Sequence, residues 1–231
     1  MRFDDRLVQR RGLLAGMLSL TAALAGCSTG GARVPGPMAA SRPVGPPSEE
    51  ELVSRYAAME DGGYQLPAVP FRQIDPRFYR QRVVNTTGER AGTVVVDTRS
   101  NFLYVVEPGG TAMRYGVGLG RAGFDWSGEG VIHWRQKWPR WKPPAEMIAR
   151  QPSLARYSVE NGGQEPGPNN PLGARALYIF QNGEDTLYRL HGTREWASIG
   201  KSVSSGCVRL INQDVIDLYD RVPGKARIVV F

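Results

Sequence analysis

Two side chains near the carboxyl end of the sequence have the types and spacing of a nucleophile and its base. Cys207 follows the small residues Ser204, Ser205 and Gly206, which permit a tight turn with backbone N–H groups pointing in one direction. A thiolate can attack an amide carbonyl, and N–H donors in such a turn stabilise the oxyanion that forms. His191 lies sixteen residues upstream, at the end of a predicted strand. It could activate a thiol whose ordinary pKa of about 8.5 keeps it protonated at neutral pH.

The counts of histidine and cysteine limit the alternatives. The sequence has two cysteines and two histidines. His133 is the competing base, but it lies among Trp134, Lys137 and Trp138, which favours a packed or surface position. Spacing alone leaves a non-catalytic Cys/His pair open. Because a zinc site of the usual type needs several Cys and His ligands, we predict no metal, and we predict no other cofactor.

The first 26 residues have the features of a secretion signal. Four arginines among the first twelve residues precede an apolar run from Gly12 to Gly26, too short for a membrane-spanning helix of about 20 residues. Leu24-Ala25-Gly26-Cys27 resembles a lipobox, the sequence at which bacteria attach lipid to a cysteine. We therefore expect a signal peptide over 1–26, a lipid on Cys27 and an exported envelope lipoprotein that faces the periplasm. An ordinary signal peptide that contains a cysteine, or a one-pass anchor, is the alternative.

Lipidation would change the meaning of the cysteine count. Two cysteines in an exported protein normally predict a disulfide. A lipid on Cys27 leaves Cys207 as the only thiol of the mature chain, and such a thiol is either buried and inert or chemically employed. The net charge of +7 falls to about +5 without residues 1–26, which carry four arginines and two aspartates. Since Lys and Arg are scattered, we expect an anionic wall or membrane surface as neighbour, and no nucleic acid.

The composition divides the remaining chain into three parts. Residues 28–48 are rich in Gly, Pro, Ala and Ser, which predicts a flexible linker. Residues 49–92 contain a helical candidate over 49–59 and then a proline-punctuated stretch, which we interpret as an N-terminal arm packed on the main domain. Residues 93–231 are rich in β-branched and alternating apolar residues, which predicts a mostly β domain, sandwich-like or barrel-like, with a few short helices.

The candidate strands flank the two chemical residues, and one helix follows them. Asn212 is a good cap for this helix, whose apolar stripe ends before Pro223-Gly224, so that the helix would fix the cysteine segment against the sheet. A turn over 181–184 predicts a hairpin. The predicted strands are 93–97, 102–106, 113–118, 176–180, 186–190 and 226–231.

Several separated motifs together resemble the L,D-transpeptidase (YkuD-like) catalytic domain. They are His191-Gly192-Thr193, the segment 204–209 with Asn212, and Asn170-Pro171-Leu172-Gly173 before the strand 174–180. The resemblance covers roughly residues 93–231. It implies a mostly β catalytic domain that acts on peptidoglycan stem peptides in cell-wall synthesis and shape, and that carbapenems inhibit.

The resemblance also implies a role for each residue of the motif. Cys207 would be acylated by a stem tetrapeptide with release of D-alanine, and the amine of a second stem would resolve the thioester into a 3→3 cross-link. His191 would be the base, and the carbonyl of Gly192 would orient its ring. The N–H groups of Gly206 and Cys207 would form the oxyanion hole. Arg209 would support the site or a substrate carboxylate, with a structural ion pair as the alternative.

One departure and several rival functions remain open. Many members have histidine where this sequence has Ser205; if that imidazole tunes the thiolate, the pKa of Cys207 is affected here, whereas a backbone role would change little. The thioester could be resolved by water (an L,D-carboxypeptidase), by the side chain of a lipoprotein or by another amine. A non-catalytic peptidoglycan-binding lipoprotein is the alternative from a different class. A papain-like protease would have its cysteine before its histidine, the reverse of the order here.

Four tryptophans surround a cluster of prolines. The segment is too broken by proline for a central strand, so we expect a loop that flanks the cleft and contacts peptide or glycan. A hydrophobic cluster under a long loop is the alternative. The tryptophans are Trp126, Trp134, Trp138 and Trp141.

Overall fold

The computed structural model describes residues 44–120, 127–204 and 207–231. The predicted signal peptide, its lipidation site Cys27 and most of the linker 28–48 lie outside these residues, as do Trp126, Ser205 and Gly206. The described residues all belong to one structural unit. None of the helices in this part of the chain is both long and apolar enough to span a membrane.

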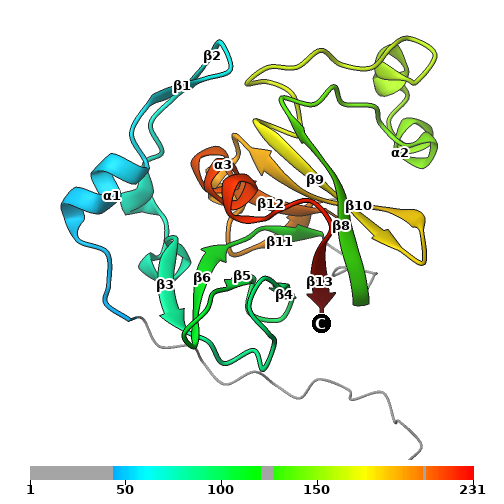
Figure 1. Cartoon of the computed structure of the whole chain (residues 1–231). Helices are drawn as coiled ribbons and strands as arrows, with labels where there is room; N and C mark the ends of the chain where they lie inside the picture. The colour runs from blue at the N-terminus through cyan, green and yellow to red at the C-terminus, as the bar shows by residue number, and fades with distance from the viewer. Residues whose placement is uncertain (1–43, 121–126, 205–206) are drawn as a thin grey trace, which may run out of the picture. The chain divides into compact units, whose positions relative to one another are not determined.

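One nine-stranded sheet organises the described chain, which confirms the prediction of a mostly β fold with a few short helices. Its strand order is β12-β10-β9-β8-β13-β4-β5-β6-β3, and the pairs β10–β12 and β4–β13 are parallel (Figure 1). The strands are β3 (Gln81–Val84), β4 (Val94–Asp97), β5 (Phe102–Val106), β6 (Thr111–Gly116), β8 (Gly128–Lys137), β9 (Arg175–Gln181), β10 (Glu184–Thr193), β12 (Val208–Ile211) and β13 (Ala226–Val230).

Shorter elements complete the architecture. Two small pairs lie outside the main sheet, the antiparallel β1 (Met59–Asp61) with β2 (Tyr64–Leu66) and the parallel β7 (Leu119–Gly120) with β11 (Ser202–Ser204). The helices are α1 (Glu49–Arg55), α2 (Ala145–Arg150) and α3 (Asn212–Arg221). The 3-10 turns are η1 (Phe71–Gln73), η2 (Pro76–Phe78), η3 (Pro152–Tyr157) and η4 (Trp196–Ser198).

The first core lies between the sheet and α3, the helix that follows the cysteine segment. Alternation along a strand sends every second side chain to the same face. Leu190 of β10 and Leu210 of β12 therefore point to the face that α3 covers, where they pack in one buried cluster with Val215 and Leu218. The helix thus holds the two strands that carry the predicted nucleophile and base.

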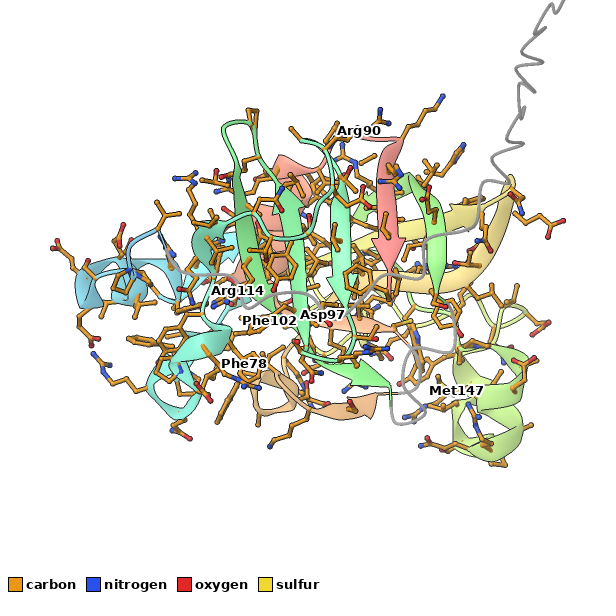
Figure 2. The ribbon with its side chains drawn as sticks, turned by 90° about the horizontal axis from the view of Figure 1, so that it is seen from below. Phe78, Arg90, Asp97, Phe102, Arg114 and Met147 are labelled. Carbon is orange, nitrogen blue, oxygen red and sulfur yellow. The ribbon has the colours of Figure 1, made fainter. Side chains whose placement is uncertain are left out.

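The second core lies where the segment before residue 93 packs on the sheet. Phe78 of η2 lies against Phe102 of β5, with ring centroids 5.4 Å apart, and the guanidinium of Arg114 lies 4.3 Å from the centroid of the Phe102 ring (Figure 2). Ile211 of β12 joins the same buried cluster. Because β3 pairs with β6, the sheet itself begins inside the segment predicted as an arm.

The helix at the start of this segment is shorter than the sequence suggested. Ser48 and Glu51 form a capping box, in which Ser48 Oγ accepts from the Glu51 N–H and Glu51 Oε2 from the Ser48 N–H. The predicted helix over 49–59 ends at Arg55, and Met59 already belongs to β1.

The expectation of a loop around the tryptophans is wrong for its first half. Residues 128–137 form β8, a ten-residue strand that pairs with β13 and β9 in the middle of the sheet. The prolines lie beyond residue 137, so they remove no hydrogen bond from this strand. A register shift between Ile132 and Trp134 breaks the simple alternation and hides the strand pattern.

Trp138 lies in a buried satellite cluster, which was the alternative for this group. Its ring centroid lies 4.3 Å from that of Tyr64, and its Nε1 donates to Asp61 Oδ2 at 2.7 Å. Trp141 pairs with Gln164 through two backbone hydrogen bonds. Trp134 on β8, the buried Trp138 and Trp141 in its backbone pair therefore have different environments rather than one common face.

A buried acidic cluster joins α3 to the N-terminal segment. Asp214 is fully buried; Arg80 Nε lies 3.7 Å from its Oδ1, and the Tyr56 hydroxyl donates to its Oδ2 at 3.4 Å. Asp217, one turn later, lies 3.2 Å from Arg80 Nη1. Burial raises the pKa of Asp214 to about 6, although the charge of Arg80 opposes the shift. The folded protein therefore holds this proton at pH values where the unfolded chain, with a pKa of 3.8, has lost it.

We expect Asp214→Asn to change how stability depends on pH. Because the pKa of Asp214 is raised in the folded state, its contribution to the free energy of unfolding is fully present below about pH 4. This contribution is lost as the pH rises through about 6. The amide that replaces the carboxyl does not titrate and has no such loss. Between pH 4 and pH 7 the free energy of unfolding of the variant should therefore rise by about 2 kcal/mol relative to that of the wild type. Urea unfolding of both proteins at several pH values measures the difference.

Asp217→Asn is the matched control, because its shift has the opposite sign. Burial acts to raise its pKa, yet the hydrogen bond from Arg221 and the charge of Arg80 hold the pKa below its ordinary value. This variant should lose stability relative to the wild type as the pH rises from 3 to 6. Parallel pH curves for wild type and Asp214→Asn would contradict the assignment.

Candidate active site

Strands β10 and β12 bring the predicted nucleophile and base to one face of the sheet. The two strands are parallel, and His191 is the register partner of Arg209, one position after the pair Leu190 and Val208. Leu190 and Val208 point toward α3, so His191 and Arg209 point to the opposite face. Extending the register back by one pair places Cys207 beside Arg189. Cys207 is half-buried, and its sulfur forms no disulfide with any described residue.

The surroundings of His191 hold its side chain as a neutral ring with a defined tautomer. The side chain is 6% exposed, and Nδ1 lies 2.8 Å from the carbonyl oxygen of Gly192. A carbonyl only accepts, so this contact assigns the proton to Nδ1 and leaves the lone pair on Nε2. Burial lowers the pKa of His191 to about 4; the Gly192 hydrogen bond opposes the shift, and the positive charges of Arg209 and Arg189 add to it. At neutral pH the ring can therefore accept a proton.

Cys207 is a protonated thiol in this environment. Burial raises its pKa, although a hydrogen bond from the backbone N–H of Arg189 and the positive charges of Arg189 and Arg209 oppose the shift. Both shifts favour the neutral forms of the two groups over an imidazolium–thiolate pair. The arrangement therefore suits removal of the thiol proton during attack rather than before it.

Steric crowding explains why the residue after His191 is a glycine. A Cβ on Gly192 would lie 2.3 Å from Asn212 Oδ1 and 3.0 Å from Val215 Cγ1, so no other residue fits without displacement. Asn212 Oδ1 accepts the backbone N–H of Ala174 at 2.9 Å. The amide thereby links the start of α3 to the start of β9, beneath the carbonyl that orients the histidine.

The prediction that Asn212 caps the helix is wrong. Asn212 is the first residue of α3, its predecessor Ile211 has the cap position, and no side chain caps the first turn. Asn212 Oδ1 instead accepts from the buried N–H of Ala174, 38 residues away in sequence, which only the folded sheet brings near. A helix cap and the observed tertiary hydrogen bond both need a side-chain oxygen of the kind that Asn provides, so the sequence pattern alone suggested the cap.

Arg209 makes the ion pair that the sequence left as an alternative. Its Nη1 lies 2.8 Å from Glu195 Oε2, a carboxylate that is largely exposed. Its backbone forms two hydrogen bonds with Gly118, N to O at 2.8 Å and O to N at 2.9 Å, which cover the free edge of β12. The guanidinium therefore lies on the face of His191, paired with an exposed carboxylate.

His133, the competing base, lies away from this site. His133 is exposed on β8, where its ring packs against Phe180 at a centroid distance of 4.8 Å. Three strand spacings separate β8 from β12, about 14 Å. Among the described residues, no group of three or more His, Cys, Asp or Glu side chains could hold a metal ion. Ser205 and Gly206, which carry part of the predicted oxyanion hole, lie outside the described residues.

Sequence reasoning missed Arg189, which stands beside Cys207 in the register. Arg189 binds Asp185 through both Nη atoms, at 2.7 Å and 2.8 Å, and its Cζ lies 4.4 Å from the centroid of the Tyr178 ring. Its position two residues before His191 places both on one face of a strand. That signal was present in the sequence, but the neighbouring strands were unknown.

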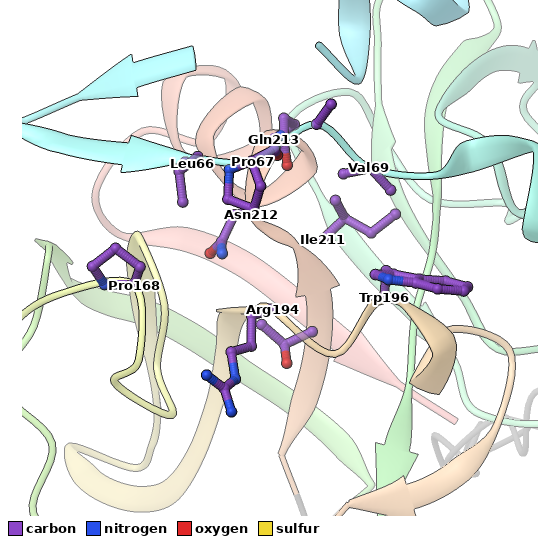
Figure 3. Close-up of a pocket in the computed structure, with 11 residues that line it drawn as sticks. Leu66, Pro67, Val69, Pro168, Arg194, Trp196, Ile211, Asn212 and Gln213 are labelled. Carbon is purple, nitrogen blue, oxygen red and sulfur yellow. Dashed lines mark hydrogen bonds between the residues drawn. The ribbon is translucent and has the colours of Figure 1, made fainter. Parts of the chain in front are cut away.

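A small cavity of about 50 Å³ borders this face at the carboxyl ends of β10 and β12. Thr193 and Ile211, two residues beyond His191 and Arg209, line it together with the segment 66–69 (Figure 3). Arg194 and Trp196 also line it. The N-terminal segment therefore forms a wall next to the candidate active site.

Comparisons with known proteins agree with this geometry. The family model of the L,D-transpeptidase catalytic domain, YkuD, matches residues 91–230. Probable L,D-transpeptidase ErfK/SrfK of Escherichia coli is 31% identical over 157 residues, which are 65% of this chain and 47% of that protein. Probable L,D-transpeptidase YbiS of the same species is 33% identical over 143 residues, 59% of this chain and 43% of that protein. The chain thus spans less than half the length of these two relatives.

A solved structure from Brucella melitensis, named a probable carnitine operon oxidoreductase, is 46% identical and covers 67% of this chain and 94% of its own. Its TM-score is 0.47, and at that value nothing on fold or function follows from the alignment. The family model, in contrast, matches more than half of the chain. The chain therefore belongs to the L,D-transpeptidase catalytic domain family.

Proposed function

We propose that this protein is an L,D-transpeptidase that works through an acyl-enzyme on Cys207. The observation that carries the proposal is the neutral ring of His191, whose Nδ1 is bound to Gly192 and whose Nε2 carries the lone pair. His191 lies opposite Arg209 in the register, and Arg209 is two residues from Cys207 in the chain. A thiol with a raised pKa needs such a base at the moment of attack. The substrate is the stem tetrapeptide of peptidoglycan.

In the acylation step Cys207 supplies the nucleophile, and His191 carries the thiol proton to the leaving amine. As Cys207 Sγ bonds to the carbonyl carbon of the third stem residue, His191 Nε2 takes the thiol proton. The carbonyl oxygen becomes an oxyanion, for which the N–H groups of Gly206 and Cys207 are the donors in this proposal. The imidazolium then gives its proton to the leaving amine, and the C–N bond breaks. D-alanine departs, and a thioester remains on Cys207.

The second step runs through the same proton route in reverse. An acceptor amine attacks the thioester carbonyl while His191 takes a proton from the amine. The C–S bond breaks, and the proton returns to the sulfur of Cys207. When the acceptor is the side-chain amine of a second stem, the product is a 3→3 cross-link. Arg209 exchanges Glu195 for a substrate carboxylate in one of the two stems.

The amino-terminal sequence supports a location of the protein in the cell envelope. A signal peptide over 1–26 and a lipid on Cys27 place the catalytic domain on the periplasmic side of the envelope, on a linker over 28–48. A positively charged chain suits an anionic wall and acidic stem peptides. Lipoprotein side chains or other amines are alternative acceptors.

The test is incubation of the purified protein with tetrapeptide muropeptides, followed by separation and mass analysis of the products. D-alanine release with cross-linked dimers supports transpeptidation, and release with tripeptide monomers only assigns a carboxypeptidase. If the folded protein binds muropeptides but releases no D-alanine, the protein is a peptidoglycan-binding lipoprotein and the proposal fails.

A further inference from the structure

A row of stacked side chains crosses the sheet and ends beside Cys207. Trp134 of β8 pairs in register with Tyr178 of β9, and Tyr178 pairs with Arg189 of β10. The rings of Trp134 and Tyr178 are stacked, with centroids 4.3 Å apart and planes at 27°. The guanidinium of Arg189 lies 4.4 Å from the Tyr178 centroid. We call Trp134, Tyr178 and Arg189 the aromatic row.

Exposure changes sharply along the aromatic row. Trp134 is 52% exposed, whereas Tyr178 is 8% exposed and Arg189 is tied to Asp185 by two hydrogen bonds. A single exposed apolar residue is ordinary on a protein surface. This indole, however, is held by stacking on one side and lies on a rigid central strand, in line with the nucleophile. A flat ring fixed in this way and half exposed offers its exposed surface to a ligand.

We propose that Trp134 binds the sugar ring that carries the donor stem, by stacking against the face of that ring. The inference rests on the proposed function, because it takes the stem tetrapeptide as the donor. The ligand class is an amino sugar joined to the amino end of the stem. Sugars present flat C–H faces, which pack on exposed aromatic rings and leave their hydroxyl groups in water.

The dimensions of the sheet match those of the stem. Three strand spacings of about 4.8 Å separate β8 from β12, so Trp134 lies about 14 Å from Cys207. The attacked carbonyl belongs to the third stem residue, and three extended residues span about 10 Å. The linkage from the first residue to the sugar accounts for the remaining few ångströms. A stem bound across the strands therefore brings its sugar over Trp134.

The charges of the row also favour a sugar at its outer end. Asp185 neutralises the guanidinium of Arg189, so the row offers no free cation to a carboxylate near Trp134. The residues beside the indole on β8 are the exposed His133 and the half-buried Gln136, which can bond to hydroxyl or amide groups. Carboxylates of the stem meet Arg209 instead, at the end of the row next to Cys207.

The experiment compares two donors with the same stem, one joined to its disaccharide and one as free tetrapeptide. In Trp134→Ala, kcat/KM for the disaccharide donor should fall roughly tenfold, or about 1.4 kcal/mol. The free tetrapeptide and carbapenem acylation, which involve no sugar, should keep their wild-type rates. Trp134→Phe should recover most of the loss because it keeps a ring. Val159→Ala, which removes an exposed side chain from a loop, is the matched control.

A binding measurement separates this inference from the proposed function. In the Cys207→Ala background, which cannot react, adding Trp134→Ala should raise the Kd of the disaccharide tetrapeptide roughly tenfold and leave that of the free tetrapeptide unchanged. This holds even if the wild type proves inactive. Equal losses for both ligands, or no loss for either in folded variants, would overturn the inference.

Discussion

Cys207→Ala should abolish D-alanine release from stem tetrapeptides. The variant keeps the sheet and the base but has no atom that can form the thioester, so the remaining rate should fall at least about 10⁴-fold. Because Cys207 is half-buried at the edge of β12, removing its sulfur should change the melting temperature little. Product analysis with tetrapeptide muropeptides measures the rate.

Cys27→Ser is the matched control, since Cys27 is the other cysteine of the sequence. This variant should keep full activity in solution while it loses the lipid. Residual D-alanine release by folded Cys207→Ala, above a few parts in 10⁴ of the wild-type rate, would show that another group attacks the substrate.

His191→Ala should slow acylation by about 10² to 10⁴-fold, the usual contribution of a general base. The wild-type rate should fall only as the pH drops through about 4, where His191 becomes protonated. The variant must rely on the small thiolate fraction of a thiol whose pKa is raised, so its rate should climb with pH through the alkaline range. Stopped-flow acylation rates from pH 3.5 to 10 measure both profiles.

The other histidine serves as the control for this prediction. His133→Ala changes an exposed ring on β8, about 14 Å from β12, and should leave the pH profile of acylation unchanged. A wild-type acid limb that survives in His191→Ala, or one that is lost in His133→Ala, would assign the base elsewhere.

The sequence was a better guide to the residues that carry the chemistry of the site than to the residues that surround them. Cys207, His191 and Gly192 stand close together in a short, ordered set of motifs, and a carbonyl next to a histidine is a local contact. Arg209 had two possible partners, and only the fold brings Glu195 within 2.8 Å. The row from Trp134 to Arg189 depends on two strand pairings, and only that of β9 with β10, across the turn over 181–184, has a local signal in the sequence.

The fold shows the same division between local and tertiary information. Most predicted strands formed because alternation and β-branched residues act locally. Strand β8 was missed because a register shift interrupts its alternation and nearby prolines suggested a loop. Asn212 was assigned to a cap because local rules favour it there, yet the buried N–H of Ala174 is its partner. Tertiary hydrogen bonds overrode local preference at this position.

The segment before residue 93 was the least predictable part. Its elements are short, and their stability comes from packing of Phe78 and Ile211 in one cluster rather than from helix or strand propensity. The cavity beside the candidate active site shows why the segment matters, since residues 66–69 form part of its wall. Its strand β3 completes the edge of the sheet.

Acylation by a carbapenem tests whether Cys207 forms a covalent acyl-enzyme with His191 as its base. The purified protein is incubated with a carbapenem, its intact mass is recorded over time, and the adduct is located by peptide mapping. We expect a single adduct on the peptide that contains Cys207, absent in Cys207→Ala and slow to form in His191→Ala. A folded wild-type protein that forms no adduct, or one that carries it on another residue, would contradict the account.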